Sequence, residues 1–155
     1  MKFLSSLILA SAFAGAAFVA TAQEQRGTKE EAVALVNAAA AHVQKAGPEQ
    51  AYKDFTDKAN TEWRKKDMYV FVNRFDGTTL AHGGNDKLVG KNTSELKDQD
   101  GKPFIMEMAA TARKSGSGWV DYSWAHPETK KLAAKTTYVK ALPSGDTFVG
   151  VGIYR

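Results

Sequence analysis

The sequence predicts an α+β protein in which helices cover both faces of a five-stranded antiparallel sheet. Three observations carry this prediction: an amphipathic helical pattern follows residue 28, the apolar period changes to that of strands at Met68, and turn residues separate five extended segments. A long N-terminal helix on one face of the sheet, with a loop and a short helix on the other, would bury every apolar stripe.

The first 22 residues have the features of a secretory signal peptide. Lys2 precedes an apolar run from Phe3 to about Val19, and Ala20-Thr21-Ala22 then forms an A-x-A cleavage site. We therefore expect a mature, periplasmic chain of residues 23–155, which is the size of one domain. The alternative is an uncleaved anchor, because about 17 apolar residues stand at the lower limit of a membrane span. No later segment is apolar for long enough to cross a bilayer.

Composition excludes several kinds of site. The chain has no cysteine, so disulfides, thiolate metal sites and covalently attached c-type haem are excluded. Its formal net charge is +4, and basic residues are interspersed with acidic ones, as in Lys29-Glu30-Glu31. Nucleic-acid binding therefore lacks the basic stripe that it requires. The mild positive excess is compatible with a small anionic ligand.

The helical part of the chain has clear boundaries. Thr28-Lys-Glu-Glu31 fits a capping box, in which the Thr28 hydroxyl accepts from the backbone N–H of Glu31 and the Glu31 carboxylate reaches back. Apolar residues then recur on one helical face from Ala32 to Val43. Gly47-Pro48 ends this helix and starts a second one, which we expect to run to about Lys58.

Extended segments make up most of the rest. MYVFVNRF and TTLAH flank Asp76-Gly77, a dipeptide that favours a tight hairpin turn. Residues 83–101 are polar and rich in Gly and Asn, and we expect them to form a long, functional loop over one face of the sheet. A short helix follows, and Gly116 closes it. Three strands over 118–125, 132–142 and 147–154 complete the chain.

The sequence contains no recognisable catalytic or metal-binding motif. The spacings H-E-x-x-H and G-x-S-x-G and the P-loop are absent, and Asp98-Gln-Asp-Gly101 lacks the later ligands of a calcium loop. His42 lies within the amphipathic helix and is interpreted as a surface or boundary residue. We therefore expect no enzyme activity, no metal and no cofactor. A hydrolase that uses His82 with an aspartate is an alternative, which the lack of a nucleophile motif disfavours.

Recognition chemistry is concentrated in the strand 118–125. Alternation places Val120, Tyr122 and Trp124 on one face and Trp119 on the other. Large rings on both faces require that both faces are covered, or that one lines a cavity. Tyr and Trp suit a cavity because each joins a broad apolar surface to one hydrogen-bonding group.

Two further segments offer polar groups. His82 ends the second hairpin strand, and it is either a ligand-binding side chain or a polar strand end beside a flexible turn. The strand 132–142 adds Lys135 and Tyr138, a cation and a phenol of the kind that a carboxylate ligand requires. Strict alternation puts these two on opposite faces, so they converge only through a bulge, a twist or the reach of the lysine.

A series of short motifs, spread in order over essentially all of residues 23–155, indicates a family resemblance. They are Trp63, MYVFV at 68–72, Asp76-Gly77, LAH at 80–82, LVGKN at 88–92, Lys97-Asp98, Asp100-Gly101, GWVDYSW at 118–124, Lys135, Tyr138-Val139 and VGVGIY at 149–154. Together they resemble the single-Cache, type 2 family of extracytoplasmic sensor domains.

This resemblance implies a PAS-like sheet and a pocket between the sheet and the loop and helix that cover it. It also implies reversible binding of small molecules, often short carboxylates such as acetate, propionate, pyruvate or lactate, without turnover. The pocket residues that it implies are Tyr69, His82, Trp119, Tyr122, Trp124, Lys135 and Tyr138.

Family members commonly sit between transmembrane helices of chemoreceptors or histidine kinases, whereas this chain stops one residue after Tyr154. We therefore expect a periplasmic module that binds a small organic acid and either carries it or signals through a separate membrane-bound sensor or transporter. The alternative is an accessory or structural partner of such a membrane protein, with a vestigial pocket.

Overall fold

The computed structural model describes residues 26–155, and the predicted signal peptide lies outside them. The helices are α2 (Lys29–Ala46), α3 (Pro48–Thr56) and α4 (Phe104–Ser115). The strands are β1 (Arg64–Lys65), β2 (Met68–Arg74), β3 (Thr79–His82), β4 (Ser117–Ala125), β5 (Leu132–Ala141) and β6 (Thr147–Tyr154), and the short 3-10 helices are η1 (Thr61–Trp63) and η2 (Asp86–Leu88). The predicted α+β class is confirmed.

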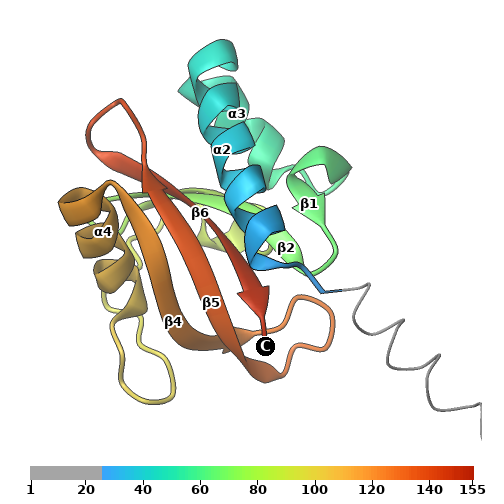
Figure 1. The fold of residues 1–155 in the computed structure, drawn as a ribbon, viewed down its shortest axis with the longest axis vertical. Helices are drawn as coiled ribbons and strands as arrows, with labels where there is room; N and C mark the ends of the chain where they lie inside the picture. Colours follow the sequence, from blue (N-terminus) through green and yellow to red (C-terminus); the bar gives the residue numbers. More distant parts are fainter. Residues whose placement is uncertain (1–25) are drawn as a thin grey trace, which may run out of the picture.

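The strands form one antiparallel sheet in the order β1-β2-β6-β5-β4, and β3 also pairs with β2. The C-terminal strand β6 is therefore central, between β2 and β5 (Figure 1). The sheet has six strands rather than the predicted five because the two-residue β1 pairs with the start of β2. Gly77 adopts φ 91° at the predicted β2–β3 turn, a conformation that glycine favours.

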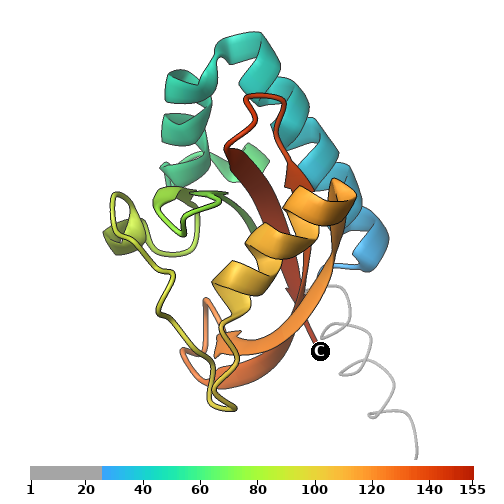
Figure 2. The ribbon, with the colours of Figure 1, turned by 90° about the vertical axis from the view of Figure 1, so that its left-hand side faces the viewer.

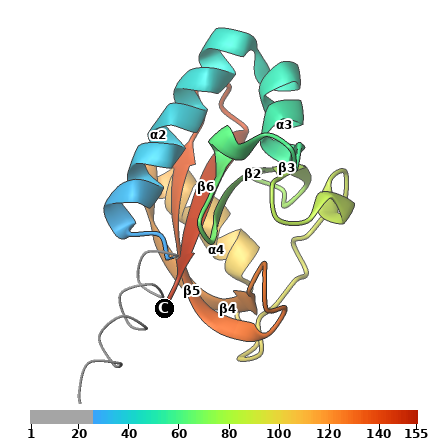
Figure 3. The same cartoon turned by 90° about the vertical axis from the view of Figure 1, so that its right-hand side faces the viewer.

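Each face of the sheet has its own apolar cluster. One cluster joins α2 and α3 to the side chains of β2 and β6 that point toward them, among them Val70 and Val151. The other joins α4 to the opposite face, including Phe71, Tyr122 and Phe148. Residues 83–101, here called the covering segment, run from β3 down beside α4 (Figure 2), while α2 and α3 are best seen in Figure 3.

The predicted capping box fixes where α2 begins. The Thr28 hydroxyl accepts from the Glu31 backbone N–H at 3.2 Å, and the Thr28 N–H donates to the Glu31 carboxylate at 2.9 Å. A further ion pair joins Lys66 to the same carboxylate at 2.7 Å. The cap therefore fastens the start of α2 to the turn between β1 and β2.

Replacing Thr28 with alanine is expected to lower the free energy of unfolding by about 1 kcal/mol, because one N–H group at the start of the helix loses its acceptor. Urea unfolding of the wild type, Thr28→Ala and Thr28→Ser measures this. Serine keeps the accepting hydroxyl, so it is expected to retain most of the stability. Equal losses in the two variants would contradict a role for the hydroxyl.

The end of the covering segment is hydrogen-bonded to β4. The Asp98 carboxylate accepts from the backbone N–H groups of Ser123 at 3.2 Å and Lys102 at 2.9 Å. The hydrogen bond from Lys102 is the main cause that lowers the pKa of Asp98, and the hydrogen bond from Ser123 acts in the same direction. Lys102 Nζ in turn donates to the Asp121 carbonyl. The covering segment is thus fastened to β4 beside Tyr122 and Trp124.

Candidate functional site

A narrow cavity lies between the sheet, the covering segment and α4. Its volume is about 20 Å³, which is room for roughly one water molecule. The residues that line it come from five parts of the chain: Tyr69, Phe71 and Asn73 of β2, Thr79 and His82 of β3, Leu88, Thr93 and Leu96 of the covering segment, Phe104 and Ile105 of α4, and Tyr122 and Trp124 of β4.

Aromatic rings form the wall on the α4 side. Phe104 stacks on Tyr122 with ring centroids 4.5 Å apart and planes 8° from parallel, and it meets Trp124 edge-on at 5.2 Å. The Tyr122 hydroxyl is within 3.1 Å of the Thr137 hydroxyl, so its polar end is already satisfied. Burial raises the pKa of Tyr122, which therefore stays neutral.

His82 presents a hydrogen-bond donor to the cavity. Its Nδ1 accepts from the backbone N–H groups of Asn85 at 2.8 Å and Gly84 at 3.2 Å, which places the imidazole proton on Nε2. Burial, reinforced by the charge of Lys135, lowers the pKa of His82 to about 3, so the ring is neutral at physiological pH. Among residues 26–155, Nε2 has no hydrogen-bond partner.

Lys135 is the one lysine buried in the described part of the chain, with 1% of its surface exposed. Its Nζ donates to the hydroxyl oxygens of Tyr69 at 2.8 Å and Tyr154 at 3.3 Å. It also lies 4.2 Å and 4.6 Å from the centroids of these two rings. Gly152 makes this possible, because a Cβ there would lie 2.2 Å from Lys135 Cε.

The surroundings of Lys135 determine its pKa and its hydrogen bonds. Burial lowers the pKa of Lys135 to about 7, while the negative charge of Asp67 acts in the opposite direction. Tyr154 donates its own proton to the Ala125 carbonyl at 2.8 Å. The Tyr69 oxygen accepts from the lysine, and burial, together with a hydrogen bond to Tyr154, raises the pKa of Tyr69. The Tyr69 side chain also lines the cavity.

An open cleft of about 370 Å³ adjoins the cavity. Tyr69, His82 and Trp124 line both spaces. The cleft also carries Lys58, Lys87 and Lys130. Three ammonium groups at the entrance favour the approach of an anion, although Lys58 is paired with Asp86 at 2.8 Å.

The structure brings together five of the seven predicted site residues. Tyr69, His82, Tyr122 and Trp124 line the cavity, and Lys135 lies behind Tyr69. Alternation along β5 places Lys135 on the cavity side without any bulge, because it pairs across the sheet with Tyr122 on one side and Tyr154 on the other.

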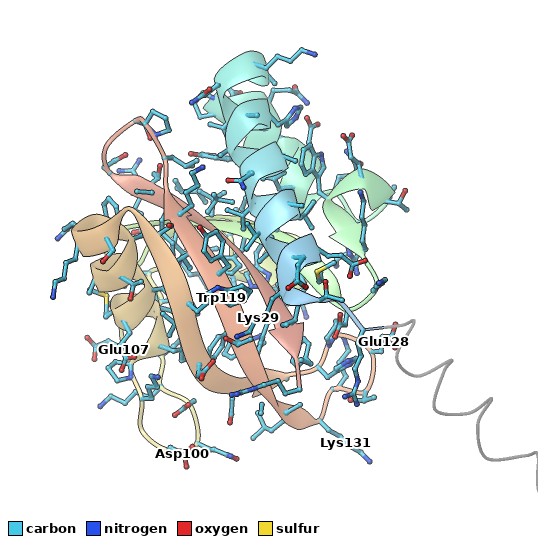
Figure 4. The ribbon with its side chains drawn as sticks, viewed as in Figure 1. Lys29, Asp100, Glu107, Trp119, Glu128 and Lys131 are labelled. Atoms are coloured by element: carbon cyan, nitrogen blue, oxygen red, sulfur yellow. The ribbon has the colours of Figure 1, made fainter. Side chains whose placement is uncertain are left out.

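Trp119 and Tyr138 are not brought to the cavity, and their predicted place in the pocket is corrected. They are a cross-strand pair on the opposite face, with ring centroids 5.3 Å apart, and they pack against the cluster under α2. The ammonium of Lys29 lies 5.1 Å from the Trp119 ring, and Figure 4 shows the two side by side. Alternation explains this, since each is an odd number of residues from its strand's cavity-facing residues.

Sequence reasoning missed several residues of the site. Phe71 and Asn73 follow Tyr69 at two-residue steps on β2, so alternation alone could have found them. Tyr154 and Phe104 gave no such signal, because their places depend on which strands are neighbours and on how α4 packs. Within residues 26–155 no group of three His, Asp or Glu side chains could hold a metal ion, and no helix is long and apolar enough to span a membrane.

Comparison with known proteins identifies relatives among sensor proteins. The sequence model of a family described as "Cache domain" matches residues 27–155. The chain is 38% identical over 89 residues to the sensor histidine kinase MctS of Rhizobium johnstonii, covering 57% of this chain and 19% of the kinase. It is 32% identical over 88 residues to the methyl-accepting chemotaxis protein McpP of Pseudomonas putida, covering 57% of this chain and 16% of that protein. The chain thus spans less than a fifth of either relative.

Solved structures share the fold. A Cache chemosensory domain described in terms of carboxylic acid recognition superposes with a TM-score of 0.71 at 24% identity, over 90% of this chain and 97% of that one. The periplasmic sensor domain of a chemotaxis protein superposes with a TM-score of 0.64 at 27% identity, over 81% of this chain and 88% of that one. These likenesses agree with the six-stranded sheet covered on both faces.

Proposed function

The chain belongs to the Cache domain family, and from this premise we propose that it binds a short-chain carboxylic acid, such as acetate, propionate, pyruvate or lactate, without chemical turnover. The observation that carries the proposal is the pair of polar side chains at the cavity, the Tyr69 hydroxyl and the neutral His82 imidazole, with the Lys135 amine directly behind Tyr69. Hydrogen-bonding side chains and a nearby cation are what a carboxylate requires.

The arrangement favours an anion over a neutral ligand. A carboxylate oxygen bound to the Tyr69 hydroxyl would lie roughly 5 Å from Lys135 Nζ, because two hydrogen bonds of ordinary length separate them. At an effective dielectric constant of about 20, one positive charge at that distance contributes about 3 kcal/mol of attraction. A neutral ligand gains nothing comparable.

The size of the cavity supports a small ligand and requires an opening step. The cavity of about 20 Å³ is smaller than any C2 acid, so the covering segment or the rings of Phe104 and Tyr122 must move when the ligand enters. The cleft that shares Tyr69, His82 and Trp124 offers the route. Each added methylene demands further movement, which favours two or three carbon atoms.

Acetate is expected to raise the unfolding temperature of the purified protein, and acetamide is not. The two molecules match in size and differ in charge. At about 100 times its dissociation constant, acetate adds about 2.7 kcal/mol of stability. Propionate, pyruvate and lactate belong in the same thermal-shift series. If no acid of two to four carbon atoms shifts the midpoint more than its neutral amide, the proposal fails.

A second candidate is an accessory or structural partner of a membrane sensor or transporter, whose pocket has become vestigial. The closed cavity favours it, because it holds about one water molecule. Capture of a defined membrane protein that is indifferent to carboxylates, together with a negative thermal-shift series, would support this candidate.

We further propose a periplasmic location and a membrane-bound sensor or transporter as the partner of the liganded protein. The family and the names of the relatives support extracytoplasmic sensing. The predicted signal peptide at residues 1–22 lies outside the described residues.

A further inference from the structure

A buried polar cluster lies at the end of the cavity away from Tyr69. It consists of Asn73 on β2, Thr79 on β3 and Thr93 on the covering segment, whose side chains are 1%, 1% and 4% exposed and all line the cavity. Asn73 and Thr79 are paired across the two strands. The other cavity-facing residues of β2, Tyr69 and Phe71, are aromatic, so an amide in this row needs an explanation.

A structural role accounts for part of the cluster. Asn73 Nδ2 is within 3.2 Å of the Thr93 hydroxyl, 3.3 Å of the Thr79 hydroxyl and 3.4 Å of the Gly77 carbonyl. The Thr93 hydroxyl donates to the same carbonyl at 2.8 Å. These bonds fasten the β2–β3 turn and the covering segment to β2.

The structural role leaves the Asn73 amide oxygen unexplained. Among residues 26–155 no donor reaches Oδ1, although the side chain is almost wholly buried. In the described residues the side-chain atom that is sealed in protein without a partner is Asp67 Oδ2, so Asn73 Oδ1 keeps contact with the cavity, where a water molecule or a ligand can reach it. Because Asn73 lines the cavity, a ligand that carries a donor can satisfy this oxygen.

We propose that Asn73 Oδ1 is a second polar subsite, and that the ligand is a short carboxylic acid with a hydroxyl group beyond carbon 2, such as 3-hydroxypropionate. This inference rests on the proposed carboxylate site at Tyr69 and His82. A hydroxyl fits better than an ammonium, because the side chains beside Asn73 are uncharged and a buried cation there would lack an anionic partner.

The position of the hydroxyl follows from the register of the strands. His82 lies opposite Phe71, and Asn73 is one same-face step further along β2, which is about 6–7 Å. A hydroxyl on carbon 2 lies beside the carboxylate and stays near His82. A hydroxyl further along the ligand chain points toward Asn73.

Calorimetric titration of the purified protein with three acids tests the proposal. Lactate and 3-hydroxypropionate are isomers that differ only in the position of the hydroxyl, and propionate lacks it. We expect 3-hydroxypropionate to bind about tenfold more tightly than either of the others, as one neutral hydrogen bond to a buried acceptor provides. Asn73→Leu is expected to erase this preference, whereas Asn37→Leu, the same change at an exposed position of α2, is expected to retain it.

The outcomes separate the two proposals. If propionate binds and 3-hydroxypropionate binds no better, the Asn73 subsite is overturned while the carboxylate site stands. A preference that persists in Asn73→Leu also overturns the subsite. If none of the acids binds, the carboxylate site fails and the subsite with it. Should Asn73→Leu not fold, the ranking of the three acids by the wild type still decides, because equal affinities refute the subsite.

Discussion

Replacing Lys135 with methionine is expected to leave the unliganded protein at least as stable as the wild type and to weaken acetate binding by about two orders of magnitude. Methionine fills a similar volume between the rings of Tyr69 and Tyr154 and removes an amine that burial makes costly to charge. Exchanging a buried charged group for an apolar one of similar volume is often neutral, or stabilising by about 1–4 kcal/mol.

The loss of affinity has a separate cause. Lys135 acts on the ligand from behind Tyr69, because its amine holds the phenol oxygen at 2.8 Å and places a charge next to the cavity wall. Removing an attraction of about 3 kcal/mol weakens binding more than a hundredfold. Stability and affinity therefore change in opposite directions, which a merely destabilised variant would not show.

Lys131→Met is the matched control. Lys131 belongs to the same part of the chain and loses the same charge, but it is exposed, and Figure 4 shows it pointing away from the domain. We expect this variant to bind acetate like the wild type. Urea unfolding gives the stability of each protein, and calorimetric titration gives its affinity. Full affinity in Lys135→Met would remove the lysine from the site.

The sequence predicted those features that depend on local patterns. The Thr28 cap, the Asp76-Gly77 turn and the bounds of β6 follow from residue types and spacing, and the structure has them where they were expected. Alternation also predicted which face of β4 carries Tyr122 and Trp124, which is the face that lines the cavity. The alternation of residues along a strand shows which side chains share a face.

It was not possible to predict from the sequence which face of a strand lines the cavity or which strands are neighbours in the sheet. Trp119 has the same chemistry as Trp124, and only the position of α2 over the sheet assigns it to the other layer. Tyr154 became a partner of Lys135 because β6 lies beside β5, a pairing that depends on the whole topology. The objection that Lys135 and Tyr138 face opposite ways was correct, and its physical basis is the uninterrupted register of β4 with β5.

The stability of the unliganded protein is expected to rise with pH between about 7 and 10 and to fall below about 6.5. Lys135 has a pKa of about 7 when folded and 10.5 as its ordinary value, so between these the unfolded chain binds the extra proton. Stability then increases with pH by about 1.4 kcal/mol per unit. Burial raises the pKa of Tyr69 and Tyr154, which opposes this rise above pH 10. The pKa of His82 is about 3 in the folded protein and 6.5 as its ordinary value, so the folded protein loses stability as the pH falls from 6.5 toward 3.

Carboxylate affinity is expected to show the opposite trend above pH 7. The ligand favours the charged form of Lys135, whose amine is increasingly neutral at higher pH, so binding must take up a proton. Affinity then falls by about tenfold per pH unit above 7 until it is about two orders of magnitude lower, the level expected with a neutral amine, while His82 and the two tyrosines keep their protonation states up to about pH 10. Urea unfolding and calorimetric titration in buffers from pH 6 to 9.5 measure both trends. Lys135→Met is expected to abolish both slopes, and an acetate affinity that stays constant across this range would show that Lys135 does not charge on binding.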